Sequence, residues 1–582
     1  MKTTEDLKLI PDKEINEHLK DVWQMTSRTE TTSQLIRCKD STIEGMINKH
    51  SFSLKIIMII LLFGVIASIL KTALAYGQPS GYTLNVDASI RQGNLSHFWT
   101  DISQDKMYIL LEPGVQDALR IQAKELGFKR IRAHGILNDD VGLYHWDGIA
   151  GHSPRYSWTN FDKILDFLIS INMDPIMELS FMPKDLALEP GSGKYIFSVP
   201  KDWEKWRDMV YEIVKHCVER YGRAKTTQWH WEVWNEPDLL NFQFGNWPAD
   251  YCKLYQLAFE GALAANPDIK FCAPDVSNIL NASGFLDCCN GDNIKFDYFS
   301  WHVYASGEST DADPYFILST LRSGRELLEK KGFKDKPQCI HEWGPSWSYP
   351  MGGRTLPYPS ERGKDTEFGA AFVVKTVKIF LDEIKECKMA PQTFAYWCSS
   401  DIYEEDEDYR KLPEFYYGFG ITNRSGIHKP VYNGFKMLHS LGDTRISLTG
   451  GCSAQNDGVD GVASLNNDST VLCALVYNFY KNVDSKGTDT IQLLINNIPF
   501  NGKVKIEHYR VDSTHSNAFS AWENMGSPHD LNADQLKLLK SKHNLERFEP
   551  DIYTNLSTHS YIKTIALPRQ SVSLITMSLI KK

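Results

Sequence analysis

The chain has 582 residues and no concentrated run of Lys and Arg, and its formal net charge is -10 with an isoelectric point near 6.0. Phosphate backbones are bound by dense basic faces, so we expect no nucleic-acid partner. Hydrophobic residues make up 42% and charged residues 23% of the chain. This ordinary globular composition and length suit two or three domains with substantial cores.

The eleven cysteines are scattered and lack the paired spacing of a zinc-binding motif. Cys288 and Cys289 are the one close pair, and adjacent cysteines rarely bridge each other. One or two disulfides between more distant cysteines are expected in an oxidising compartment. The sequence leaves their pairing open.

Residues 56–70 form a continuous apolar run, short for a membrane-spanning helix but suited to the core of a signal peptide. The Ala73-Leu74-Ala75 triplet resembles a cleavage site. Because roughly fifty polar residues precede the run, two interpretations stay open. Either Met46 is the working start, or residues 51–75 are an uncleaved signal anchor that follows a polar segment, residues 1–50. A buried core helix is less favoured, because the run is apolar on all faces.

Both membrane interpretations place the residues after Tyr76 in the lumen or outside the cell, so we expect a secreted, lysosomal or single-pass membrane protein. The Asn-X-Ser sequons agree, because they follow the apolar run and none precedes it. They begin at Asn94, Asn281, Asn423, Asn467 and Asn555. The sequence therefore predicts a glycoprotein.

Between about residues 95 and 445, short strand-like runs alternate with amphipathic helical stretches. The strand-like runs are residues 97–102, 129–137, 174–180, 228–236, 269–276, 296–304, 337–343 and 393–401. Eight such repeats predict an α/β fold, a (β/α)8 TIM barrel over residues 80–445. Active sites of this fold lie at the carboxyl ends of the strands.

After about residue 445 the pattern changes to β runs with few helices between them, which favours a β-sandwich over residues 446–582. Residues 82–90, ahead of the barrel, can add a strand to this domain. Residues 532–545 predict one helical insertion. The expected organisation is therefore a leader segment, a barrel and a C-terminal β domain.

The fourth predicted barrel strand ends in a carboxylate. Its sequence Trp229-His230-Trp231-Glu232-Val233-Trp234-Asn235-Glu236-Pro237 alternates tryptophans with other residues. Pro237 cannot donate to a sheet ladder, so it ends the strand. Glu236 is then placed at the mouth of the barrel.

The seventh predicted strand ends in the same way, at Ile340-His341-Glu342-Trp343-Gly344. Two carboxylates at strand ends suit hydrolysis of a glycosidic bond, in which one acid protonates the leaving oxygen and the other carboxylate attacks the sugar or activates water. Aromatic neighbours offer flat faces to a sugar ring. A carbohydrate substrate is therefore expected.

Several motifs resemble glycoside hydrolase family 39, a family of retaining enzymes with the (β/α)8 fold. The resemblance covers nearly everything after residue 80 and includes the two glutamate corners. The further motifs are Arg132-Ala133-His134-Gly135-Ile136, Trp301-His302-Val303-Tyr304, Tyr396-Trp397-Cys398-Ser399-Ser400-Asp401-Ile402-Tyr403-Glu404-Glu405, Gly418-Phe419-Gly420-Ile421, Lys429-Pro430, Tyr509-Arg510-Val511-Asp512, His515-Ser516-Asn517 and Met525-Gly526-Ser527-Pro528.

This resemblance implies roles for individual residues. Glu236 would be the general acid and base, and Glu342 the nucleophile. Asn235 would bind the sugar 2-hydroxyl, and Trp397 would lie beneath the ring. His134, His302, Tyr304 and Glu404 would line the rest of the sugar pocket. The mechanism requires neither a metal nor a cofactor.

The family contains β-xylosidases and α-L-iduronidases. The iduronidase branch carries a Lys two residues after the histidine of the sixth strand, where this chain has Tyr304, and Asn-Asp-Glu-Ala around the nucleophile. The Asp401–Glu405 and His515–Asn517 elements match the xylosidase branch, although His341 stands where those enzymes usually carry Asn. A β-xyloside is therefore the favoured substrate, and an iduronide the alternative. A membrane-tethered carbohydrate-binding protein without catalysis is the alternative of another class.

Overall fold

The computed structural model describes residues 81–239, 244–348, 357–387, 390–402 and 411–581. The predicted signal or anchor segment, residues 56–70, and Glu404 lie outside these ranges. Among the described helices, none combines the length and the apolar character needed to cross a membrane.

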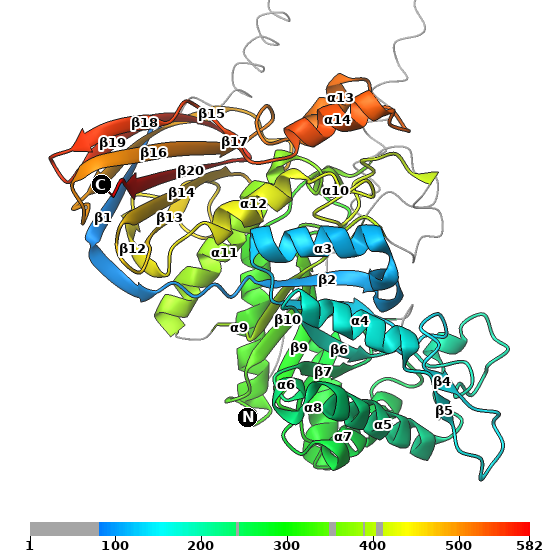
Figure 1. Ribbon diagram of the computed structural model, residues 1–582. Coiled ribbons are helices and arrows are strands. Elements are labelled where there is room, and N and C mark those ends of the chain that lie inside the picture. The colour runs from blue at the N-terminus through cyan, green and yellow to red at the C-terminus, as the bar shows by residue number, and fades with distance from the viewer. Residues whose placement is uncertain (1–80, 240–243, 349–356, 388–389, 403–410, 582) are drawn as a thin grey trace, which may run out of the picture. The chain divides into compact units, whose positions relative to one another are not determined.

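Eight parallel strands close into a barrel, as the sequence predicted (Figure 1). In barrel order they are β10 (Gln338–Gly344), β11 (Thr393–Tyr396), β2 (Asp101–Lys106), β3 (Arg130–His134), β6 (Asp174–Leu179), β7 (His230–Val233), β8 (Lys270–Val276) and β9 (Tyr298–Tyr304). Each neighbouring pair is parallel. The carboxyl ends of all eight strands therefore meet at one rim.

Helices cover the outside of the barrel. The longer ones are α3 (Pro113–Leu126), α4 (Thr159–Ser170), α5 (Trp203–Tyr221), α7 (Ala249–Ala265), α8 (Ala282–Gly291), α9 (Pro314–Lys330), α11 (Glu367–Cys387) and α12 (Pro430–His439). Short elements in the loops are β4 (Tyr144–His145), β5 (Arg155–Tyr156), α6 (Arg223–Thr226) and α10 (Pro359–Arg362). Local sequence sets some of the boundaries: Asp202 caps α5 by accepting from two backbone amides, and Asp313 caps α9 ahead of Pro314.

The first barrel strand begins four residues later than predicted. The sequence favoured residues 97–102, whereas β2 has the polar sequence DISQDK. Its buried polar groups are satisfied inside the barrel wall: Asp101 binds Arg130, and Ser103 donates to the carbonyl of His341. An apolar pattern cannot reveal a strand of this kind.

The C-terminal strands and β1 form one sheet along the path β17-β16-β20-β14-β13-β12-β1-β15-β19, with β18 paired to β16. These strands are β1 (Gly81–Asn94), β12 (Thr444–Thr449), β13 (Gly458–Leu465), β14 (Val471–Phe479), β15 (Thr488–Asn496), β16 (Gly502–Val511), β17 (Glu546–Arg547), β18 (Ile552–Leu556), β19 (Tyr561–Pro568) and β20 (Ser571–Leu579). The sheet curls around a core of its own, to which most of these strands contribute.

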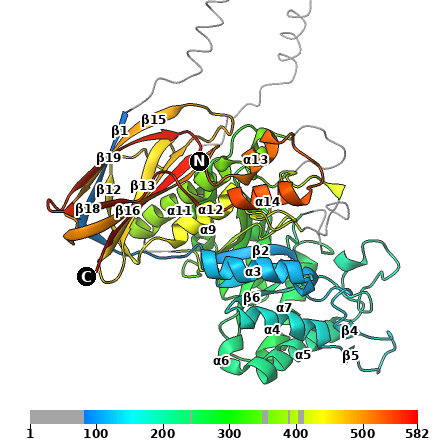
Figure 2. The ribbon, with the colours of Figure 1, turned by 45° about the horizontal axis from the view of Figure 1, so that its top comes forward.

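The strand ahead of the barrel, β1, pairs antiparallel with β12 and parallel with β15. Two helices extend from the sheet, α13 (Ala518–Asn524) and α14 (Ala533–Lys542), and they pack against each other (Figure 2). Helices α11 and α12 contact the barrel side of the sheet through β14, β20 and β16. The sheet thus packs against the last two helices of the barrel.

Candidate active site

A buried arginine forms the floor of the site. Arg132, on β3, is fully buried, and its Nη1 donates to Oε1 of Glu342 at 2.8 Å. Its Nε donates to Glu232 at 2.6 Å and its Nη2 to Asp275 at 2.7 Å. Burial opposes the charged guanidinium, but the surrounding carboxylates hold the pKa of Arg132 well above its ordinary value. Arg132 is thus a permanent cation beneath the rim.

Glu342 is held at both oxygens. Arg132 binds Oε1, and the Tyr304 hydroxyl donates to Oε2 at 2.7 Å. Burial and the Glu342 charge raise the pKa of Tyr304 well above its ordinary value, so the hydroxyl remains a donor. Nε2 of His134 lies 3.6 Å from Oε1. Glu342 is 5% exposed and its carboxylate is oriented by charge-assisted hydrogen bonds.

Glu236 faces Glu342 across the rim. Its backbone has φ 45°, in the left-handed region that non-glycine residues seldom adopt. Nδ1 of His302 lies 2.9 Å from its Oε1. A carboxylate oxygen of Glu236 and one of Glu342 lie within 4.8 Å of each other. This separation matches the short spacing of retaining glycosidases, about 5 Å, and not the wider spacing of inverting ones.

His302 connects the two glutamates to the floor. Its Nδ1 contacts Glu236, and its Nε2 lies 3.3 Å from Oδ2 of Asp275. Burial alone would lower the pKa of His302, but the charges of Glu342 and Asp275 and the contact with Glu236 raise it to about 10. At neutral pH His302 is therefore an imidazolium beside Glu236, Glu342 and Asp275.

His134 is positioned by a second buried acid. Its Nδ1 is 2.8 Å from Oε2 of Glu178, which also accepts from Arg132 at 2.7 Å. Burial raises the pKa of Glu178 to about 7, although Arg132 opposes the shift. The ring of His134 lies 5.0 Å from that of Trp397. Glu178 therefore fixes how His134 faces the rim.

A cavity of about 580 Å³ opens above these residues. All the predicted site residues that the structure describes line it: His134, Asn235, Glu236, His302, Tyr304, Glu342 and Trp397. Trp397, Phe419 and Tyr304 make one aromatic wall, and Trp347 stands at the rim, 57% exposed. The cavity combines flat apolar faces with carboxylates, as a sugar site requires.

The tryptophans of the two glutamate corners, residues 229–237 and 340–344, do not line this cavity. Trp229 packs against Tyr221 of α5 at 5.5 Å, and Trp343 stacks on Phe394 at 4.3 Å. Alternation along a strand points every second side chain toward the helices. The aromatic residues expected beside the sugar come instead from β9, the end of β11 and the loops.

A register shift in β10 brings Glu342 to the rim. The pairing of β10 with β9 shifts between Ile340 and Glu342. Regular alternation would place His341 and Glu342 on opposite faces, yet His341 binds Asp275 and Glu342 binds Arg132, both inside the barrel. Irregularities of this kind re-aim side chains next to active sites.

Sequence reasoning missed the buried acids Glu178, Glu232 and Asp275. Each is an isolated acid within an apolar strand, and no local pattern indicates its partner. Arg132 stood in a recognised motif without an assigned role. An Arg two residues before a strand-end His, on the same face of the strand, is the signal that could have identified it.

Comparison with known proteins shows a family match along most of the chain. The family model "Glycosyl hydrolases family 39" matches residues 82–550. A β-xylosidase from Caldicellulosiruptor saccharolyticus is 29% identical over 472 residues, covering 78% of this chain and 90% of the relative. Human α-L-iduronidase is 25% identical over 344 residues, covering 54% of this chain and 48% of that protein.

Among solved structures, a monomeric β-xylosidase from Caulobacter crescentus CB15 superposes with a TM-score of 0.73 at 23% identity. The match covers 86% of this chain and all of that one. This likeness supports the fold, a barrel followed by a β domain.

Proposed function

This chain belongs to glycosyl hydrolase family 39 and is a retaining O-glycosidase, and from that membership we propose that its cavity removes terminal β-xylosyl residues from a carbohydrate. The observation that carries the mechanism is the separation of the two carboxylates, within 4.8 Å at their nearest oxygens. Retaining glycosidases hold their two carboxyl groups about 5 Å apart, so that one of them attacks the sugar directly, whereas inverting enzymes hold them about 6.5 to 9.5 Å apart to admit a water molecule.

Glu342 is the proposed nucleophile. Arg132 and Tyr304 hold one oxygen each, which keeps the carboxylate anionic and directs it toward the anomeric carbon. Attack breaks the glycosidic bond and forms a glycosyl ester on Glu342. The charge that Arg132 and Tyr304 stabilised is then lost from the carboxylate.

Glu236 is the proposed general acid and base. The His302 imidazolium donates toward Glu236 at 2.9 Å, so this pair keeps a proton beside the leaving oxygen. Glu236 passes the proton to the leaving group in the first step. It takes a proton from the attacking water in the second step, which hydrolyses the ester.

The remaining residues are proposed to bind the sugar. Arg132 Nη2 donates to Oδ1 of Asn235 at 3.0 Å, which leaves the Asn235 NH₂ group to bind a sugar hydroxyl. Trp397 offers its ring to the sugar face, and His134 and Tyr304 bound the pocket. Glu404 keeps its proposed role as a hydroxyl acceptor.

The choice of a xyloside over an iduronide rests on the relatives and on position 304. The relative named a β-xylosidase covers more of this chain than the one named an α-L-iduronidase. The charged side chains that line the described cavity are carboxylates and imidazoles. A uronate carboxylate is best met by a lysine or arginine, and the chain has Tyr304 where the iduronidase branch has Lys.

The substrate is tested by comparing p-nitrophenyl β-xyloside with an α-L-iduronide. We expect turnover of the xyloside, a loss of about 10² to 10⁴-fold in Glu236→Ala, and no measurable turnover in Glu342→Ala. Glu308→Ala, which removes an exposed carboxylate near the rim, is the matched control and should keep full activity. Turnover of the iduronide alone would refute the xyloside assignment, and a chain that binds glycosides without cleaving any would favour the carbohydrate-binding alternative.

Azide distinguishes the two glutamate roles. In Glu236→Ala, azide should attack the glycosyl ester and give a β-glycosyl azide, with retention. In Glu342→Ala, azide should take the place of the missing nucleophile and give the α-glycosyl azide, with inversion. The opposite pairing of products would exchange the two roles.

A secretory location is proposed from the sequons and residues 56–70. Asn94, Asn281, Asn467 and Asn555 are exposed, whereas Asn423 is 1% exposed and bound to Glu414. After expression in a eukaryotic secretory host, deglycosylation should increase the mobility of the chain, and Asn423→Gln should leave that shift unchanged. An N-terminus at Tyr76 would indicate cleavage, and an intact N-terminal segment would indicate an anchor.

A further inference from the structure

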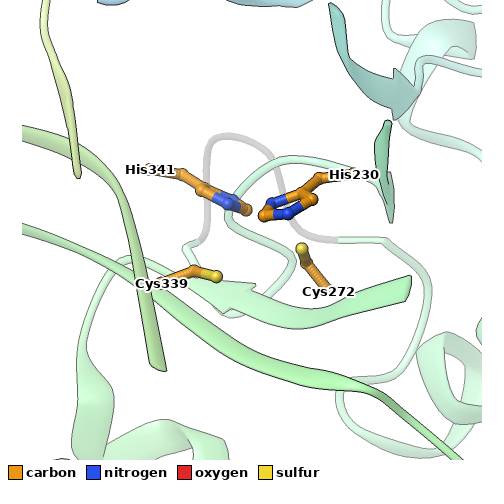
Figure 3. A group of neighbouring side chains, drawn as sticks. All are labelled: His230, Cys272, Cys339 and His341. Carbon is orange, nitrogen blue, oxygen red and sulfur yellow. The ribbon is translucent and has the colours of Figure 1, made fainter. Parts of the chain in front are cut away.

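Four side chains with nitrogen or sulfur donors meet inside the barrel (Figure 3). They are His230 of β7, Cys272 of β8, and Cys339 and His341 of β10. His230 is 5% exposed and the other three are fully buried. One donor atom from each lies within 4.8 Å of the others.

Strand geometry explains how the four converge. Cys339 and His341 both lie on β10, and their donor atoms converge within 4.8 Å. Parallel pairing places Glu232 of β7 beside Cys272 of β8, and His230 lies on the same face as Glu232. These side chains therefore occupy neighbouring positions of the barrel interior.

Two of the four imidazole nitrogens in this cluster lack a nitrogen or oxygen partner. Nδ1 of His230 and Nε2 of His341 are both buried, and within the described residues neither makes a hydrogen bond to a nitrogen or oxygen atom. A buried polar atom without a partner costs about 1 to 3 kcal/mol. The Cys339 sulfur contacts both imidazoles and Cys272. These nitrogens therefore point to a ligand that accepts their lone pairs.

His341 is already oriented as a metal ligand. Its Nδ1 lies 2.8 Å from Oδ1 of Asp275 and 2.5 Å from Oε2 of Glu232. A carboxylate that binds one imidazole nitrogen fixes the tautomer and directs the other nitrogen to a metal. Arg132 holds both carboxylates in place from the other side.

We propose that His230, Cys272, Cys339 and His341 bind a structural zinc ion. Two thiolates and two imidazoles are a common tetrahedral zinc set, and two thiolate charges would balance the dication inside the barrel. Tetrahedral zinc places its ligand atoms about 3.3 to 3.8 Å apart. The donor atoms lie within 4.8 Å of one another. Side-chain rotations that move each donor atom by about an ångström would bring them to the distances of a zinc site.

A carboxylate site formed by Glu232, Asp275 and His341 is the competing possibility in the same region. The guanidinium of Arg132 binds Glu232 and Asp275 directly and compensates their charge. A dication between them would lie against that permanent cation. The cysteine side of His341 is free of this repulsion and offers the softer donors that zinc favours.

A disulfide between Cys272 and Cys339 is the other competing possibility. The two residues lie on β8 and β10, on either side of β9. Two strand spacings separate their backbones by about 9 Å. A disulfide needs Cα atoms closer than about 7 Å, so the barrel wall would have to move. The metal bridges this gap without such a movement.

The zinc site would connect β7, β8 and β10 directly beneath Glu342, and it does not depend on the proposed sugar. Its ligands are spread over residues 230–341 on three strands. This spread explains why cysteine spacing predicted no metal site.

The test is the metal content of the purified full-length chain, equilibrated with a zinc buffer and then dialysed. We expect about one zinc per chain, and less than one tenth of that in Cys272→Ser and in Cys339→Ser. Cys217→Ser changes another buried, unbridged cysteine, on α5, and should keep one zinc. Zinc content unchanged in both ligand variants, or no zinc in the unmodified chain, would overturn the proposal.

A second measurement does not require the variants to fold. X-ray absorption at the zinc edge of the unmodified chain should fit two sulfur and two nitrogen ligands. Cobalt in place of zinc should give the thiolate charge-transfer bands of a tetrahedral site. A shell of nitrogen and oxygen alone, or a Cys272–Cys339 disulfide in a peptide map, would refute the site.

Discussion

At the scale of single residues, two groups orient the Glu342 carboxylate: the charged guanidinium of Arg132 and the neutral hydroxyl of Tyr304. Arg132 is also bound to Glu232 and Asp275, so changing it disturbs the whole floor. Tyr304 makes one hydrogen bond to Glu342 and otherwise contributes its ring to the cavity wall. A substitution of Tyr304 can therefore remove a hydrogen bond to the nucleophile without disturbing the other buried acids.

Tyr304→Phe should lower kcat/KM for the xyloside by about 10- to 100-fold, because a hydrogen bond to a charged group contributes about 1.5 to 3 kcal/mol. The aromatic wall is retained, so the thermal midpoint should change little. Tyr251→Phe removes a buried hydroxyl that donates to the backbone carbonyl of Val233 at 3.1 Å and not to a carboxylate. Equal activity losses in the two variants would contradict a specific role for Tyr304.

His302 should make stability depend on alkaline pH. Its pKa is raised from 6.5 to about 10 in the folded chain, so the folded state holds this proton more tightly than the unfolded state. The stabilisation is complete below pH 6.5 and is lost as the pH rises through 10. The free energy of unfolding of the unmodified chain, measured in urea, should exceed that of His302→Gln at neutral pH. This difference should decrease by a few kcal/mol across this range.

His508 provides the control for that experiment. Burial lowers its pKa to about 4, so its contribution to stability increases with pH between 4 and 6.5. His508→Gln should alter the pH dependence only in this acid window and with the opposite sign. A slope between pH 6.5 and 10 that is the same in His302→Gln as in the unmodified chain would rule out His302 as its source.

At the scale of elements, the sequence predicted the repeated strands of the barrel but not the irregular features of β2 and β10. The pattern of apolar runs predicted the number of barrel strands and the position of seven of them, and the corners at Glu236 and Glu342 identified the two facing carboxylates. Strand β2 was misplaced because its buried side chains are polar. The register shift in β10 could not be foreseen either, because its cause lies in the pairing with β9 and the partners inside the barrel.

The same limit applies to long-range pairs. Asp275 binds Arg132, His302 and His341 from three other strands, and nothing in its own neighbourhood indicates these partners. The cysteine pairing was left open for the same reason. The structure joins Cys252 of α7 to Cys288 of α8, and Cys289 remains unbridged and buried.

This disulfide should stabilise the helical pair. Linking residues 36 apart removes chain entropy from the unfolded state that corresponds to about 4 kcal/mol. In the double variant Cys252→Ala/Cys288→Ala, the free energy of unfolding measured in urea should be lower by most of this amount. Reductant should lower the midpoint of the unmodified chain and of Cys289→Ala, but not that of the double variant. A double variant that remains sensitive to reductant would contradict this pairing.

At the scale of the whole molecule, the residues that the structure describes form one compact unit, and β14 shows how its two halves are joined. Cys473, Leu475, Tyr477 and Phe479 belong to the core shared with the barrel helices, whereas Leu472, Ala474 and Val476 belong to the core inside the curled sheet. Alternation along a single strand therefore serves two cores. Polar contacts add to this join, such as that of Arg445 of β12 with the carbonyl of Leu381 of α11, at 2.9 Å.

Because β14 is buried on both faces, the barrel and the sheet should unfold together. Leu472 and Leu475 are both fully buried and face opposite cores, so their alanine variants form a matched pair. Each should lower the free energy of unfolding by about 2 to 5 kcal/mol.

Nearly all the described tryptophans lie in the barrel, so tryptophan fluorescence reports barrel unfolding. A large apolar interface couples two domains into one transition, so fluorescence and circular dichroism should shift together in both variants. If Leu472→Ala weakens the sheet but leaves the fluorescence midpoint unchanged, the sheet is a separate folding unit and its contact with α11 does not stabilise the barrel.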